Sequence, residues 1–162
     1  FAGLADAYPN WNVELWGAED GKAYYKELQL LIRKNHLENR VFLKGATNDV
    51  PSVLQHGDMF VFPSAYEGFG MALGEAMSMG LPAIGYKNCS AVNELIENGK
   101  NGYLCKDGVD DLVNKMALLM ENKDMRVQFG VLARESMKKY APKTIWNQWE
   151  MLLKNTLGTY SR

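Results

Sequence analysis

The residues best suited to chemistry in this 162-residue chain lie in PSAYEGFGMALGEAMSMGLPAIGY, residues 63–86. Its EGFG segment places Glu67, Gly68, Phe69 and Gly70 between an apolar run and a segment with helical spacing. A strand-to-helix turn needs only a capping Asn or Ser, whereas two glycines around a Phe allow close approach to the backbone. We therefore expect this turn to face a ligand.

The backbone amides of this turn suit an anion. The run before it predicts a strand, and GMALGEAMSM predicts a helix that begins near Gly70. The N–H groups of Phe69, Gly70 and Met71 would then be unpaired at the positive end of the helix dipole. Because Gly68 and Gly70 carry no side chains, a phosphate would have room to bind there.

Glu67 and Glu75 form an E-x7-E pair. On one α-helix they would lie about 12 Å apart and about 80° around the axis, too far for a shared proton or metal. With Glu67 on the loop and Glu75 one turn into the helix, each could accept hydrogen bonds from a different diol of one ligand, such as a ribose or a sugar. The alternative is that Glu67 only favours the helix dipole and Glu75 is a solvated helix residue.

Five short apolar runs alternate with segments of helical spacing. The predicted strands lie in residues 13–17, 40–45, 58–64, 81–86 and 102–105, and the predicted helices in 18–37, 49–56, 70–79, 90–99 and 110–122. Continuous apolar strands that alternate with helices predict an α/β protein with a Rossmann-like, doubly wound parallel sheet and helices on both faces. Ligands bind such sheets at the carboxyl ends of the strands, where EGFG lies.

Helical segments also occupy the two ends of the chain. Phe1, Leu4, Ala5 and Tyr8 have the spacing of the last turns of a helix, and C-terminal helices are expected over about 109–158. These helices carry two apolar stripes, one with Met116, Leu119 and Met120 and the other with Ile145, Trp146, Trp149, Leu152 and Leu153. Stripes of this kind usually pack in a core, and we interpret both in this way.

Composition excludes several classes of protein. With 47% apolar and 23% charged residues, the chain is expected to form one globular domain over residues 1–162. Its 18 basic and 19 acidic residues give no electrostatic reason for nucleic-acid binding. Cys89 and Cys105 stand outside any metal-binding pattern, so we expect no metal site and a reducing, cytoplasmic setting.

The quoted stretch resembles the E-x7-E signature of retaining family 4 (group 1) glycosyltransferases, whose usual form is close to PSxxEGFGxxxxEAMxxGxPV. HLENRVFLKGATNDVPSVLQHGDMFVFPS is similar to the family's stretch from the third to the fourth strand of its C-terminal domain. NELIENGKNGYLC resembles its E-x-I-x-x-G-x-N-G-x-L segment. The resemblance as a whole covers essentially residues 11 to 140.

The resemblance implies the C-terminal, nucleotide-sugar-binding half of a two-domain GT-B enzyme, a hexosyltransferase. Such an enzyme transfers a sugar from a nucleotide-diphospho-sugar, without a cofactor or metal, to a glycan or a lipid-linked acceptor held by its N-terminal domain. By the family pattern, Glu75 would bind the ribose and Glu67 would lie near the reacting carbon of the donor sugar. Other donor contacts would come from the backbone of Gly68, Phe69, Gly70 and Met71 at the diphosphate, and of Lys44, Gly45 and Ala46 at the base.

Two further residues come from comparison with the pattern. Family members often have a Gly-Gly pair before the position of Glu94, where this chain reads YKNCSAVNE. We expect Ser90 or Asn88 to cap this helix and Glu94 to face the site. Lys87 either meets a phosphate or is a solvated loop lysine. The Arg and Lys with which the family clamps the phosphates would precede residue 1, so we expect the isolated chain to bind donors weakly and to transfer nothing.

The predicted sheet has a gap. In the strand order 3-2-1-4-5-6 the first strand is central, and residues 13–17 and 58–64 correspond to the second and fourth strands. Without the first strand these two have unpaired edges, which favours self-association of the fragment.

The resemblance also leaves open a peripheral association of the whole protein with a membrane. The alternative functions are a nucleotide-sugar epimerase, a phosphorylase-like GT-B enzyme and a non-catalytic nucleotide-binding module.

Overall fold

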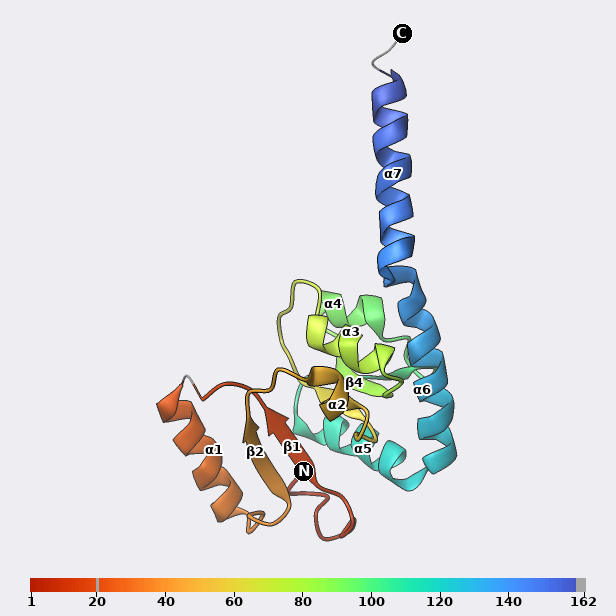
Figure 1. Ribbon diagram of the computed structural model, residues 1–162. Coiled ribbons are helices and arrows are strands. Elements are labelled where there is room, and N and C mark those ends of the chain that lie inside the picture. Colours follow the sequence, from red (N-terminus) through yellow and green to blue (C-terminus); the bar gives the residue numbers. More distant parts are fainter. Residues whose placement is uncertain (20, 160–162) are drawn as a thin grey trace.

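The computed structural model describes residues 1–19 and 21–159 and confirms the α/β class (Figure 1). Its strands are β1 (Val13–Trp16), β2 (Val41–Gly45), β3 (Phe60–Phe62), β4 (Ala83–Tyr86) and β5 (Gly102–Cys105). Its helices are α1 (Lys22–Lys34), α2 (Val50–Leu54), α3 (Met71–Ser78), α4 (Ser90–Leu95), α5 (Val109–Glu121), α6 (Lys123–Met137) and α7 (Pro142–Thr159), with a 3-10 turn η1 (Lys138–Tyr140). Each predicted strand is present within its predicted range.

The strands form two parallel sheets. β1 pairs with β2, with Leu15 opposite Leu43, and β3, β4 and β5 form the second sheet, with Val61 opposite Ile84. Within the described residues, β1 and β3 each have a neighbour on one side only, and no ladder joins them. Figure 1 shows the β1–β2 pair and α1 set apart from the remaining elements. This agrees with the predicted vacancy between the second and fourth strands of the Rossmann order.

Two apolar clusters cover the three-stranded sheet. One cluster comes mainly from α3, α4 and α6 and includes Leu73, Met77, Val92 and Ala133. The other combines the N-terminal turns, including Leu4, with α5 and with inward-facing strand residues. Side chains on successive strand residues point to opposite faces, so helices are needed on both sides of a buried parallel sheet.

Helix α6 fixes the C-terminal end of α3. A Cβ atom on Gly130 of α6 would lie 2.2 Å from the carbonyl oxygen of Gly80, so only glycine permits this approach. Arg134 Nη2 also donates a hydrogen bond to the carbonyl of Met79 at 2.9 Å. Gly80 has a φ of 85° and ends the helix, as the Gly-Leu-Pro sequence predicts. The C-terminal end of α3, the helix that follows EGFG, is therefore held against α6.

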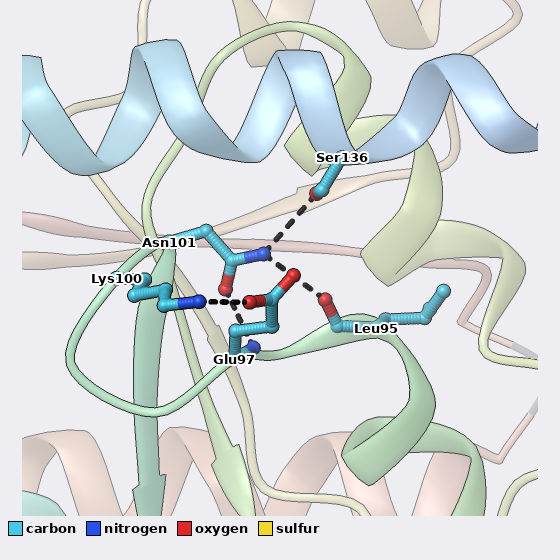
Figure 2. A network of polar contacts seen from close by, with 5 residues as sticks. All are labelled: Leu95, Glu97, Lys100, Asn101 and Ser136. Carbon is cyan, nitrogen blue, oxygen red and sulfur yellow. Dashed lines mark hydrogen bonds and ion pairs between the residues drawn. The ribbon is translucent and has the colours of Figure 1, made fainter.

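A buried asparagine joins the α4–β5 turn to α6 (Figure 2). Asn101 is 1% exposed, and its Nδ2 atom donates to the carbonyl of Leu95 at 3.2 Å and to Ser136 Oγ at 3.1 Å. Its Oδ1 atom accepts a hydrogen bond from the amide of Glu97 at 2.8 Å. Because buried polar groups are costly when unpaired, these bonds favour a single position of the turn against α6.

The second C-terminal stripe is not part of the core, so this prediction was wrong. Helix α7 projects from the body as a single helix, and its main contact is with η1 (Figure 1). Trp146 is 74% exposed and Trp149 55% exposed, and Leu152 and Leu153 are exposed too. The stripe of Met116, Leu119 and Met120 in α5 is buried as predicted. No helix in the described ranges has the length and apolar character needed to cross a membrane.

Candidate donor-binding site

The loop between β3 and α3 carries the EGFG segment and ends in a backbone conformation that requires glycine. Gly70 precedes the first residue of α3 and has φ 79° and ψ 52°, in the left-handed region that other residues rarely adopt. Gly68 is different, because a Cβ atom there would meet nothing within 4 Å. The fold itself therefore needs glycine at position 70, whereas at position 68 the absent side chain leaves open space.

The start of α3 presents unpaired amides. Gly70 offers no side chain to cap the helix, and the first backbone bond of α3 runs from the amide of Gly74 to the carbonyl of Gly70 at 3.0 Å. Among the described residues, the amides of positions 69–71 donate to no protein acceptor. Such amides at the positive end of a helix attract an anion, and they match the predicted phosphate contact.

Glu67 lies on this loop and is held by Ser64. The Ser64 hydroxyl lies 3.0 Å from Glu67 Oε1 and 3.1 Å from the carbonyl oxygen of Tyr66. Ser64 and Glu67 are half-buried, so solvent weakens this contact less than it would an exposed one. Ser64 was not predicted to have a role, although the PSxxEG spacing places its hydroxyl three residues before the carboxylate. Serine side chains commonly form hydrogen bonds with groups two or three residues away, and this tendency is the sequence signal for the contact between Ser64 and Glu67.

Glu75 lies in the second turn of α3 with an exposed side chain. It lines a cavity of about 360 Å³ together with Phe69 and Met71 from the start of the helix. The rest of the lining comes from Gly74, Ser78 and Met79 of the α3 segment, from Val50, Pro51 and Leu54 of α2, and from Met137 and Tyr140. Three of the predicted donor-binding residues, Phe69, Met71 and Glu75, therefore line one cavity. Glu67 precedes Phe69 by two residues in the sequence.

The predicted base-binding segment lies at the carboxyl end of β2. Gly45 has a φ of 74°, and its carbonyl accepts a hydrogen bond from the amide of Gly17 at 2.9 Å. Lys44 Nζ lies 3.4 Å from a carboxylate oxygen of Glu14 and 5.5 Å from the centre of the Trp16 ring. Since the Lys44 side chain is directed toward β1, this segment offers a ligand mainly the backbone of Lys44, Gly45 and Ala46.

Lys87 and Glu94 follow β4 and are both exposed. Within the described part of the chain, neither side chain forms an ion pair or a hydrogen bond. The Lys87 backbone is fixed, because its amide donates to the carbonyl of Cys105 at 2.9 Å and its carbonyl accepts from the Asn93 side chain. Both charges are therefore available at the same edge of the sheet as EGFG.

The predicted cap of α4 was wrong. Cys89, not Asn88 or Ser90, occupies the N-cap position, and it makes no side-chain hydrogen bond there. Asn88 Nδ2 instead donates to Asp107 Oδ2 at 2.6 Å, which draws its amide away from the helix start. Cys89 is buried in the apolar cluster that also contains Val92 and Leu95.

The polar groups at this edge suit a phosphorylated, hydroxylated ligand. Amides without protein partners lie between a held carboxylate and an exposed one, beside a mostly apolar cavity. No group of three or more His, Cys, Asp or Glu residues in the described ranges has the arrangement of a metal site. Carboxylates accept hydrogen bonds from diols, and helix amides bind phosphate, so one extended ligand can use both.

Comparison with protein families gives a match to one family over most of the chain. The family described as "Glycosyl transferases group 1" matches residues 1–141. The chain is 30% identical over 152 residues to an uncharacterized glycosyltransferase of Haemophilus influenzae, covering 93% of this chain and 42% of that protein. It is 32% identical over 140 residues to N-acetyl-alpha-D-glucosaminyl L-malate synthase of Bacillus anthracis, covering 85% of this chain and 36% of that protein.

Solved structures share the fold. HepE of Anabaena in complex with UDP superposes with a TM-score of 0.86 at 29% identity, over 94% of this chain and 43% of HepE. HepE in complex with UDP-glucose gives a TM-score of 0.84, also at 29% identity and with the same coverage. The chain thus spans less than half the length of these relatives.

Proposed function

This chain belongs to the group 1 glycosyltransferases, and from that membership we propose that it is the donor-binding domain of a retaining hexosyltransferase. The donor is a nucleotide-diphospho-sugar, and the acceptor is a glycan or a lipid-linked sugar held by the rest of the protein. The observation that carries this proposal is the start of α3, where amides without protein partners lie between Glu67 on the loop and Glu75 on the helix. Structures of HepE with UDP and with UDP-glucose support a nucleotide-sugar as ligand.

Each part of the donor has a proposed partner. The amides of Phe69, Gly70 and Met71 receive the diphosphate at the positive end of α3, and the open space at Gly68 admits it. Glu75 accepts hydrogen bonds from the ribose hydroxyls. The backbone of Lys44, Gly45 and Ala46 borders the base, while Lys87 and Glu94 add one charge of each sign near the phosphate and the sugar.

Glu67 is the proposed catalytic residue. Its carboxylate lies near the anomeric carbon, held by the Ser64 hydroxyl at 3.0 Å, and stabilises the positive charge that develops there as the sugar–phosphate bond breaks. The acceptor oxygen bonds to that carbon on the face the diphosphate leaves, and the hydroxyl proton passes to an oxygen of the departing diphosphate. This route forms no covalent bond to the enzyme, so trapping a glycosyl adduct on Glu67 would overturn it.

Transfer by this route needs no bound metal, because helix amides and Lys87 provide the positive potential at the diphosphate. Assays of the whole protein with and without EDTA test this point, and the same rate in both is expected. A loss of activity that Mg²⁺ or Mn²⁺ restores would contradict it.

The two cysteines are free and buried, which fits a reducing, cytoplasmic compartment for the domain.

The proposed function itself is tested by heating the whole protein with a panel of nucleotide-sugars. A ligand that binds only the folded state raises the melting temperature, and at least one nucleotide-sugar should do so at millimolar concentration. If none does, and no sugar is transferred from any of them, the proposal fails.

A further inference from the structure

We propose that Tyr140 is a positioning residue for the donor loop, acting through Phe69. The inference rests on the proposed function for its effect on donor binding. Phe69 stands in EGFG, whereas Tyr140 ends the 3-10 turn between α6 and α7. The two rings meet edge to face, with centroids 5.2 Å apart and planes at 84°.

Phe69 connects the loop to other parts of the fold beside the start of α3. A Cβ atom on Gly74 would lie 3.9 Å from Phe69 Cε1 and 4.0 Å from Met137 Sδ, so the ring rests over Gly74 close to the end of α6. Gly70, the next residue, has no side chain with which to cap the helix. The position of the helix start therefore depends on how well the neighbouring ring is held.

Tyr140 is itself anchored, so it can hold a neighbour. Its half-buried ring packs against the apolar cluster that contains Leu73 and Met77 of α3. Lys139 Nζ lies 4.8 Å from the centre of the same ring. The ring thus lies against both the loop that precedes α3 and the apolar cluster to which α3 and α6 contribute.

The same contact shapes the cavity at the donor site. Tyr140 and Phe69 both line the 360 Å³ cavity that Glu75 also lines. Phe69 is 39% exposed, so without Tyr140 its ring would have solvent on a further side and could leave Gly74. Movement of Phe69 would carry the adjacent amides away from the place where they meet a diphosphate. An edge-to-face aromatic pair contributes enough that its loss should weaken UDP binding about threefold to tenfold.

The experiment compares Tyr140→Ala with Tyr140→Phe, which keeps the ring. Hydrogen exchange of the Gly74 amide, the first to be hydrogen-bonded in α3, reports the helix start without any ligand, and calorimetry with UDP reports the donor site. Tyr140→Ala should speed exchange at Gly74 and weaken UDP binding about threefold to tenfold. Tyr140→Phe should keep both the exchange rate and the UDP affinity at the wild-type values. If Tyr140→Ala does not fold, Tyr140→Leu replaces it, with the same expectations.

The matched control is Tyr103→Ala, which removes an edge-to-face pair with Phe129 at 5.4 Å in the other apolar cluster. It should lower the melting temperature but leave both exchange at Gly74 and UDP affinity at the wild-type values. The inference is overturned if Tyr140→Ala leaves exchange unchanged, or if Tyr103→Ala changes it as much. Failure of the wild type to bind UDP or any nucleotide-sugar of the panel would count against the proposed function, while the exchange measurements would still decide the role of Tyr140.

Discussion

Ser64 Oγ lies 3.0 Å from Glu67 Oε1, so the carboxylate proposed for catalysis is held by a hydroxyl from its own loop. This contact links the end of β3 to the chemistry, because Ser64 follows that strand closely. A carboxylate on a surface loop would otherwise sample several rotamers, and a donor sugar would have to select one of them. The bond therefore preorganises the site at little cost to the fold.

Replacing Ser64 by Ala should lower kcat/KM of the whole protein about tenfold, since a hydrogen bond to a charged group contributes about 1.5 kcal/mol or more. Ser64→Thr keeps the hydroxyl and should retain most of the activity. Initial-rate kinetics with a nucleotide-sugar and acceptor measure the effect. Equal losses in the two variants would mean that the hydroxyl does not position Glu67.

Asn101→Ala should lower the free energy of unfolding by about 3 kcal/mol, because it leaves the buried carbonyl of Leu95 and the part-buried amide of Glu97 without their partners. Asn98→Ala is the matched control. Asn98 also bonds one backbone amide, that of Leu104 at 2.9 Å, but it is exposed and should cost about 1 kcal/mol. Urea unfolding measures both variants, and equal costs would contradict the account of the network in Figure 2.

Cys105 should make the free energy of unfolding depend on pH in the alkaline range. Burial, and after it the negative charge of Asp111, raises the pKa of the thiol above its ordinary value of 9.0. Because the folded state keeps the proton to higher pH than the unfolded state, the stabilisation is fully present below pH 9.0 and is lost as pH rises through the folded pKa.

The free energy of unfolding of the wild type should therefore fall above pH 9.0 more steeply than that of Cys105→Ala. Urea unfolding at a series of pH values provides the measurement. The subtraction removes the contribution of the ionisable groups that the two proteins share. Parallel pH profiles for the two proteins would show that the thiol is not buried as described.

The two tryptophans of α7 should report solvent exposure in the chain of residues 1–162. The difference between the emission spectra of the wild type and of Trp146→Phe with Trp149→Phe should resemble tryptophan in water, and iodide should quench it strongly. Trp11→Phe is the control, since Trp11 is half-buried under Arg126 at 4.8 Å. A blue-shifted difference that iodide does not quench would contradict the exposed stripe.

Local sequence signals predicted most of the fold. The apolar runs placed all five strands, and Gly70 and Gly80 placed both ends of α3 because each takes a backbone conformation that other residues avoid. The α7 stripe was predicted as core because periodicity shows that a face is apolar, not what covers it. The α4 cap was missed because the partner of Asn88, Asp107, is distant in the sequence.

The site was predicted to a similar extent. Glu67, Glu75 and the amides at the start of α3 lie on the loop and helix where the spacing placed them, although their roles remain proposals. Ser64 and Tyr140 were not recognised. The side-chain contact from Ser64 depends on the shape of the loop, and the ring contact of Tyr140 depends on how α6 packs against α3. The three-residue spacing of Ser64 and Glu67 was a signal for the first contact, whereas the contact of Tyr140 follows from neither composition nor spacing.

The most direct test of the central claim is calorimetric titration of UDP into the wild type, Glu75→Gln, Glu67→Gln and Glu135→Gln. Glu135 is an exposed α6 residue paired with Lys138 and serves as the control. Glu75→Gln should weaken UDP binding about tenfold to a hundredfold, while the other two variants should stay within about twofold of the wild type. UDP binding by Glu75→Gln that matches the wild type would contradict the placement of the ribose, and with it the proposed donor site.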